Sequence, residues 1–150
     1  MFDIAIIGSG PAGISAAINC KIRNKSFVLF GQNELSHKVE ISEKINNYPG
    51  LPNVTGEELN AKMREHLNSM KIEITDERIT GIYKMKDKFT LLADRKMFEA
   101  RAVILCLGAE TIKPLPNERE LLGRGVSYCA TCDGMLYKDK KIAVFCDNAD

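Results

Sequence analysis

The chain opens with the apolar stretch Phe2-Asp3-Ile4-Ala5-Ile6-Ile7, which leads directly into Gly8-Ser9-Gly10-Pro11-Ala12-Gly13. The first stretch is typical of a buried parallel strand. The second has the spacing GxGxxG, and a helix is predicted after it because small residues recur there at helical spacing. These residues are Gly13, Ala16, Ala17 and Cys20. Phe27–Phe30 is predicted as a second strand, which closes a βαβ unit.

The spacing of the glycines suits a dinucleotide. Gly8 permits a tight turn, Gly10 lets the backbone approach a pyrophosphate without an intervening Cβ, and Gly13 permits close packing of the helix. The helix N-terminus supplies amides and a positive potential that favour an anion. The alternative is a glycine-rich turn that only begins a helix, and the strand before the loop argues against it. The loop therefore predicts a dinucleotide phosphate site.

One feature of such a site is missing. The second strand of a dinucleotide fold normally ends in Asp or Glu, whose carboxylate holds a ribose hydroxyl. Here the strand ends at Phe30-Gly31, and Glu34 comes several residues late. We therefore expect the adenosine ribose to be held in another way, or less tightly.

The next part of the chain predicts a loop, a helix and a meander. Residues 32–55 lack hydrophobic periodicity and are rich in Asn, Pro and Gly, so we expect a long functional loop. Thr55 and Glu58 have capping-box spacing and begin a helix of roughly four turns. Its apolar stripe is Leu59, Met63, Leu67 and Met70. Short strands at residues 72–74, 79–85 and 89–92 predict a small antiparallel meander, and a buried strand at residues 102–107 follows.

A domain boundary is expected near residue 113, because Lys113-Pro114-Leu115-Pro116 is stiff and poor in backbone donors. The predicted fold class is α/β: a Rossmann-like dinucleotide-binding domain with a parallel sheet, helices and the meander, then the start of a second, related domain. Residues 1–112 form the N-terminal part of the first. Residues 113–150 begin the second and include a predicted strand at residues 141–146.

Charge and cysteine content restrict the partners. Lys and Arg number 21 against 20 Asp and Glu, with no basic cluster, which disfavours nucleic acid and anionic lipid as partners. The N-terminus lacks a basic region and is predicted as a strand rather than a signal peptide, and no stretch approaches membrane-spanning length. Five cysteines without a regular framework predict a reducing, cytoplasmic location.

Cys129 and Cys132 form a CxxC, which favours a thiolate and an exchangeable disulfide. The alternative, half of a zinc site, would need a second pair of ligands, and His37 and His66 are isolated, so no metal is predicted. Asp133 is either an acid/base for thiol exchange or a turn residue before the next glycine. The remaining cysteines are predicted to be small buried hydrophobes. They are Cys20, Cys106 and Cys146.

Five motifs occur in the order typical of low-molecular-weight thioredoxin reductases, and the chain resembles this family over essentially its whole length. They are GSGPAG from Gly8, NNYPG from Asn46, VILCLGA from Val103, GRGVSYCATCDG from Gly123 and KIAVF from Lys141. The resemblance implies FAD as cofactor, thioredoxin or a thioredoxin-like disulfide protein as partner, and a homodimer. Family members are about twice as long, so we expect these 150 residues to be part of a longer protein.

The resemblance also implies roles for single residues. Cys132 would face the flavin, Cys129 would attack thioredoxin, and Asp133 would be the acid/base. Asn47 would approach the flavin, and Gly108 would pass near the cofactor. The residues that would hold the FAD pyrophosphate are Gly8, Ser9, Gly10, Pro11, Ala12 and Gly13.

The chain departs from the family pattern in two places. A stretch containing Leu35-Ser36-His37-Lys38 replaces the family's GGQ element. The NADPH loop expected after Phe145 reads Cys146-Asp147-Asn148-Ala149-Asp150, without a glycine. This resembles the ferredoxin-dependent flavin thioredoxin reductases and predicts ferredoxin rather than NADPH as electron donor. Two alternatives stay open: an NADPH-dependent enzyme, in which Asn148 adopts positive φ, and a non-catalytic flavin-binding module that senses redox state.

Overall fold

A computed structural model describes residues 1–94, 96–108, 115–128, 130 and 134–145 of the chain. The chain divides into two compact units. The first consists of Met1–Ser42 and Thr55–Gly108, and the second of Glu43–Val54 and Ala109–Asp150. The predicted division into domains at residues 112 and 113 stays a prediction.

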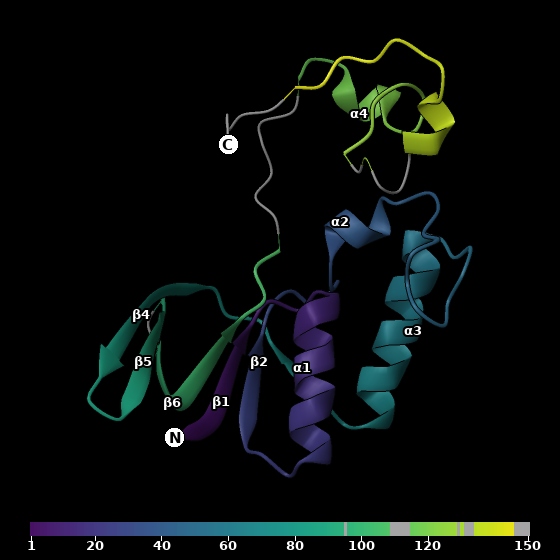
Figure 1. Cartoon of the computed structure of the whole chain (residues 1–150). Coiled ribbons are helices and arrows are strands. Elements are labelled where there is room, and N and C mark those ends of the chain that lie inside the picture. Colours follow the sequence, from purple (N-terminus) through teal and green to yellow (C-terminus); the bar gives the residue numbers. More distant parts are fainter. Residues whose placement is uncertain (95, 109–114, 129, 131–133, 146–150) are drawn as a thin grey trace. The chain divides into compact units, whose positions relative to one another are not determined.

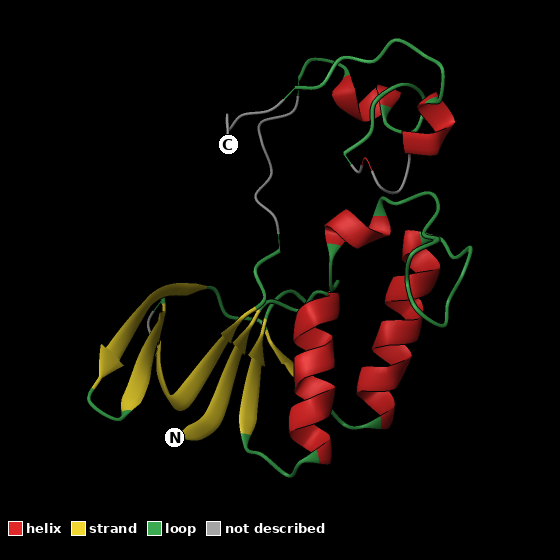
Figure 2. Ribbon diagram, viewed as in Figure 1, coloured by secondary structure: helices red, strands yellow, loops and turns green. Residues whose placement is uncertain are grey.

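The first unit is built on one six-stranded mixed sheet with the order β3-β2-β1-β6-β5-β4 (Figures 1 and 2). The strands are β1 (Phe2–Ile7), β2 (Phe27–Phe30), β3 (Ile74–Thr75), β4 (Ile79–Met85), β5 (Lys88–Ala93) and β6 (Lys96–Leu105). β3, β2, β1 and β6 run parallel to one another, whereas β4 and β5 form an antiparallel hairpin, and β5 pairs antiparallel with β6. The predicted parallel sheet with a small meander is therefore confirmed, but the strand predicted at residues 72–74 as part of the meander is wrong: β3 (Ile74–Thr75) pairs parallel with β2 at the opposite edge of the sheet.

β6 belongs to both parts of the sheet. Its first half pairs antiparallel with β5, from Lys96 opposite Ala93 to Ala100 opposite Phe89. Its second half pairs parallel with β1, up to Leu105 opposite Ile7. Sequence analysis predicted only the apolar second half, because Lys96, Glu99 and Arg101 interrupt the first half, which has neither a continuous apolar run nor a strict alternation.

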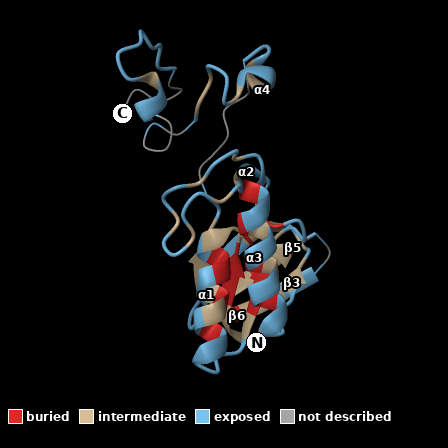
Figure 3. Ribbon diagram, turned by 90° about the vertical axis from the view of Figure 1, so that its right-hand side faces the viewer, coloured by how far each residue is buried: buried red, intermediate tan, exposed pale blue. Residues whose placement is uncertain are grey.

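Two helices cover one face of the sheet. α1 (Pro11–Ile22) packs against β1, β2 and β6 and against α3 (Gly56–Ser69). Figure 3 shows buried residues gathered where the helices meet the sheet. α3 begins with the predicted capping box: the Glu58 amide donates to Thr55 Oγ1 at 3.2 Å, and the Thr55 amide donates to Glu58 Oε2 at 2.8 Å. The predicted apolar stripe is confirmed in Leu59, Met63 and Leu67, which are buried.

The opposite face of the sheet holds a second core. Strand residues alternate between faces, so Ile6 and Leu29 point toward α1 while Ile7 and Phe30 point the other way. The residues buried on this other face are Ala5, Ile7, Val28, Phe30, Leu91 and Ala100. Phe30 packs edge-on against Phe98 of β6, with ring centroids 4.9 Å apart. Burial of one such side chain contributes about 2 to 3 kcal/mol, so this cluster fixes the meander to the parallel strands.

Residues 32–55, predicted as a loop, contain the short helix α2 (His37–Glu40). Ser36 caps it, because the Ser36 hydroxyl accepts a hydrogen bond from the Val39 amide at 3.4 Å. Four residues are too few to show a helical period, so sequence analysis missed this helix. Farther along, Ile45 and Val54 form an isolated antiparallel bridge in the second unit.

The second unit also contains α4 (Glu118–Leu121), a parallel bridge between Leu122 and Val126, and the 3₁₀-helix η1 (Gly134–Tyr137). The strand predicted at residues 141–146 is wrong for residues 141–145, which form no strand and whose apolar side chains are exposed. A strand needs a hydrogen-bonded neighbour, and residues 141–145 pair with no described strand. Among the described residues, no helix is long and apolar enough to cross a membrane.

Candidate functional site

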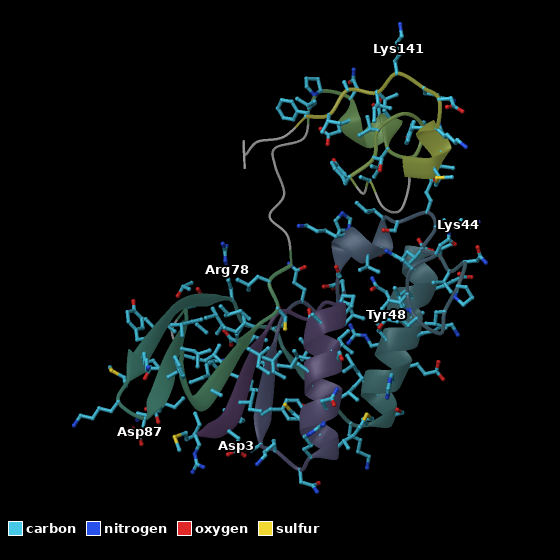
Figure 4. All side chains as sticks on the ribbon, viewed as in Figure 1. Asp3, Lys44, Tyr48, Arg78, Asp87 and Lys141 are labelled. Atoms are coloured by element: carbon cyan, nitrogen blue, oxygen red, sulfur yellow. The ribbon has the colours of Figure 1, made fainter. Side chains whose placement is uncertain are left out.

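The glycine loop lies at the carboxyl ends of three parallel strands. The Gly8 amide donates to the Phe30 carbonyl at the end of β2 at 2.8 Å, and the Cys106 amide donates to the Ile7 carbonyl at 2.7 Å. The other end of β1 carries Asp3 (Figure 4). Ligands of open α/β sheets bind beyond the carboxyl ends of the strands, and the predicted phosphate loop lies at that edge.

Packing within the protein accounts for two of the glycines. Gly8 has a φ of +115°, and a Cβ there would lie 2.1 Å from the Cys106 carbonyl oxygen. A Cβ on Gly13 would lie 1.8 Å from the Gly8 carbonyl oxygen. Both separations are far below van der Waals contact, so any side chain would push α1 or β6 away from the loop. The predicted structural roles of Gly8 and Gly13 are supported by this geometry.

Gly10 is different, because neither backbone conformation nor packing within the described residues requires a glycine there. Its φ is −78° and its ψ is −177°, an extended conformation open to any residue. The nearest described atom to a Cβ on Gly10 would be Ser36 Cβ, at 3.9 Å. The space beside Gly10 is therefore open to a ligand, and the missing side chain keeps it open.

The start of α1 suits an anion. Pro11 occupies the first turn, where its missing amide leaves no hydrogen bond unmade, and Gly10 as the N-cap brings no side chain to the amides that follow. The first turn contains no acidic residue that would repel a phosphate. These amides and the helix dipole provide the electrostatic part of a pyrophosphate site.

Gly31 and Ser9 explain the missing carboxylate at the end of β2. Ser9 is 5% exposed, and its hydroxyl donates to the Gln32 carbonyl at 3.0 Å. A Cβ on Gly31 would lie 2.3 Å from this hydroxyl oxygen and 2.7 Å from the Ser9 nitrogen. Ser9 therefore occupies the space that an Asp or Glu at position 31 would need. Sequence analysis noted Gly31 as a gap in the pattern but missed this pairing.

The remaining predicted cofactor residues lie in different units. Gly108 closes the first unit after β6 with a φ of +71°, a conformation that favours glycine. Asn47 belongs to the second unit, within Glu43–Val54, and is exposed. The contacts of Gly108 and Asn47 with a flavin stay predictions.

The cysteines outside the CxxC differ in burial. Cys20 is buried on α1, as predicted, whereas Cys106 is half-buried beside the glycine loop. Burial raises the pKa of both thiols above the ordinary value, so both are neutral at neutral pH and poor nucleophiles. Cys146 lies outside the described residues.

The redox residues predicted from the sequence, Cys129, Cys132 and Asp133, lie outside the described residues, and their roles stay predictions. Immediately before them, a hydrogen bond from Tyr128 and one from the Leu115 amide hold the pKa of the Glu118 carboxyl below its usual range. Among the described residues, no group of three or more His, Cys, Asp or Glu side chains is placed to hold a metal ion.

Comparison with known proteins identifies the family and its relatives. Residues 2–145 match the family model described as pyridine nucleotide-disulphide oxidoreductase. Over 145 residues the chain is 39% identical to a thioredoxin reductase of Bacillus subtilis (strain 168), covering 96% of this chain and 46% of that protein. The chain thus spans about half the length of the curated relatives it matches.

Solved structures of thioredoxin reductases are also similar to this chain. A ferredoxin-flavin thioredoxin reductase from Clostridium acetobutylicum is 55% identical, with a TM-score of 0.73 over 91% of this chain and 48% of that one. A thioredoxin reductase from Streptococcus pyogenes is 36% identical, with a TM-score of 0.82 over 93% and 46%. The resemblance predicted from the motifs is confirmed, and so is FAD as the cofactor of the thioredoxin reductases in this family. With its glycine loop at the head of a Rossmann-like sheet, the chain belongs to the pyridine nucleotide-disulphide oxidoreductase family.

Proposed function

We propose that the whole protein is a flavin-dependent reductase that passes electrons from FAD through Cys129 and Cys132 to the disulfide of a thioredoxin. The observation that carries this proposal is the open space beside Gly10, at the N-terminus of α1. Because the protein itself does not require glycine at that position, a ligand with a phosphate close to the backbone gives the simplest reason for it. The similarity to thioredoxin reductases identifies that ligand as FAD.

The residues of the first unit would bind the cofactor rather than react with it. Amides of the Gly8–Gly13 loop and the first turn of α1 would hold the pyrophosphate, with Gly108 and Asn47 nearer the flavin. When bound, FAD supplies a carrier for two electrons. Since Ser9 fills the space that a carboxylate at position 31 would need, the ribose would be held by other groups of the following loop.

The thiol chemistry would proceed by two exchanges. The Cys129 thiolate attacks the disulfide of thioredoxin, a mixed disulfide forms, and the sulfur that leaves takes up a proton, for which Asp133 is the donor. The Cys132 thiolate then attacks Cys129, which releases the second thiol of thioredoxin and leaves a Cys129–Cys132 disulfide. FAD, when bound and reduced, would supply the two electrons that restore the Cys129–Cys132 dithiol together with two protons, so electrons and protons balance over one turnover.

We further propose that ferredoxin, rather than NADPH, reduces this protein. A nucleotide loop depends on glycines that bring backbone amides within reach of the phosphates. Here Cys146, Asp147 and Asn148 put three side chains into the sequence where that loop is expected. The Asp147 charge close to a phosphate would cost on the order of 1 kcal/mol even in well-screened surroundings. The 55% identity to a ferredoxin-flavin thioredoxin reductase supports the same donor.

An anaerobic titration of the full-length protein tests the donor. Flavin absorbance is followed while NADPH or, separately, reduced ferredoxin is added. We expect stoichiometric bleaching by reduced ferredoxin and slow, incomplete bleaching by NADPH. Rapid, stoichiometric reduction by micromolar NADPH would show an NADPH-dependent enzyme instead. If the pre-reduced protein fails to turn over oxidised thioredoxin, the protein is a flavin-binding module and not a reductase. The homodimer and the cytoplasmic location stay predictions.

A further inference from the structure

Asn60 on α3 contacts Ser36, which borders the open space beside Gly10. Sequence analysis gave Asn60 no role. Its side-chain amide Nδ2 donates to the Ser36 carbonyl at 3.2 Å. Ser36 is also the residue nearest to that open space, with its Cβ 3.9 Å from the position of a Cβ on Gly10. The segment Leu35–Ser36 faces the proposed pyrophosphate loop, and the hydrogen bond from Asn60 holds this segment in place.

The backbone of the segment Leu35–Ser36 is strained. Leu35 is 5% exposed and adopts a φ of +66°, an uncommon conformation for a branched apolar residue. Surrounding packing must hold such a conformation in place. Part of this packing comes from α3, which lies directly against α2: a Cβ on Gly56 would lie 1.7 Å from the Val39 carbonyl oxygen of α2. The stretch with this strain is the one that replaces the family's GGQ element.

The carboxamide oxygen of the same side chain has no partner among the described residues. Asn60 Oδ1 is buried and accepts no hydrogen bond from any residue that the structure describes. Rotating the carboxamide by half a turn would place Oδ1 against the Ser36 carbonyl oxygen, so the orientation with Nδ2 toward Ser36 is the favourable one. A buried acceptor without a donor is unfavourable, so a water molecule or a ligand group is expected to donate to Asn60 Oδ1.

We propose that Asn60 is a positioning residue for FAD: its Nδ2 fixes Ser36 opposite Gly10, and its Oδ1 accepts a hydrogen bond from a hydroxyl group that is present when FAD is bound. The proposal rests on the FAD site proposed above. The O–H donor belongs either to the polyol of FAD or to a water molecule that FAD traps. With either donor, the hydrogen bond to Asn60 contributes to the affinity for FAD.

The coupling has a signature that a purely structural residue would lack. The Ser36 carbonyl also accepts hydrogen bonds from the Val39 and Glu40 amides, at 3.1 and 3.0 Å, so losing Asn60 leaves it satisfied. Asn60→Leu removes one hydrogen bond and one unsatisfied acceptor from the FAD-free protein, and the two effects oppose each other. With FAD bound, the same change removes a second hydrogen bond and gains nothing in return.

The experiment compares FAD-free and FAD-loaded full-length protein. For Asn60→Leu, and for the smaller Asn60→Ala, we expect an unchanged melting temperature without FAD and an FAD dissociation constant about tenfold higher. Asn68→Leu, at an exposed position of the same helix, is the control and should change neither quantity.

Equal losses of melting temperature with and without FAD, at unchanged FAD affinity, would show that Asn60 is only structural and would overturn the inference. Failure of the unmodified protein to bind FAD is a separate result, which would contradict the proposed function. High-resolution density for the FAD-loaded protein would then distinguish a polyol hydroxyl from a trapped water beside Oδ1. A site beside Oδ1 without either donor would also overturn the inference.

Discussion

A Cβ on Gly31 would lie 2.3 Å from the hydroxyl oxygen of Ser9. The buried Ser9 side chain of the glycine loop therefore leaves no room for a side chain on the residue after β2. This relationship joins the ends of β1 and β2. It also explains why a dinucleotide fold can lack the usual carboxylate at this position, since the space is already filled.

Gly31→Ala is expected to lower the free energy of unfolding of the FAD-free, full-length protein by about 1 to 3 kcal/mol, because the added Cβ overpacks the site. Urea unfolding measures the change. Gly10→Ala is the matched control: its Cβ would lie 3.9 Å from its nearest described neighbour, so stability without FAD should fall only by the smaller capping preference of alanine, about a few tenths of a kcal/mol. Equal stability of the two variants would show that Ser9 moves aside readily.

Asp3 makes stability dependent on pH in the acid range. Hydrogen bonds from the Ser26 amide and hydroxyl, with a smaller effect of Arg101, hold the pKa of the Asp3 carboxyl below its ordinary value of 3.8. A lowered pKa in the folded state stabilises the protein above pH 3.8, and this contribution is lost as the pH falls through the folded-state pKa.

Asp3→Asn should therefore destabilise the protein near pH 7 and lose most of this effect at a pH below the lowered folded-state pKa of Asp3. Chemical unfolding of both proteins at the two pH values measures it. A difference in stability that is the same at both would mean that the charge on Asp3 contributes nothing.

Cys129→Ser and Cys132→Ser should each abolish thioredoxin reduction and leave FAD bound, since the relay needs both sulfurs while the cofactor is held by the glycine loop. In Cys129→Ser, the remaining Cys132 thiolate should give a long-wavelength charge-transfer band with oxidised flavin. Cys20→Ala, at a buried cysteine with a raised pKa, is the control that should keep thioredoxin reduction. A band confined to Cys132→Ser would reverse the two assignments.

Features with a local cause could be predicted from the sequence. β1, the glycine loop and α1 follow from an apolar run, fixed glycine spacing and small residues at helical spacing, all within about twenty residues. The capping box at Thr55 is equally local. β4 was predicted with the bounds that the structure has, because its strand alternation ends at a charged turn.

Features that depend on contacts between distant segments could not be predicted. Gly31 conflicts with Ser9, 22 positions earlier, and Asn60 bonds to Ser36, 24 positions earlier. α2 exists because Ser36 caps it and α3 packs on it, not because of its own four residues. The apolar run at residues 141–145 has the composition of a strand but no described neighbour to pair with.

The most direct test of the account is the FAD affinity of Gly10→Val in the full-length protein, measured together with the stability of its FAD-free form. Gly10 has an extended conformation with open space beside it, so valine should change the FAD-free stability by about 1 kcal/mol or less. In the same variant the branched side chain would occupy the place of the pyrophosphate, and the FAD dissociation constant should rise about a hundredfold or more. Unchanged FAD affinity in a folded Gly10→Val protein would contradict the claim that this loop holds the cofactor.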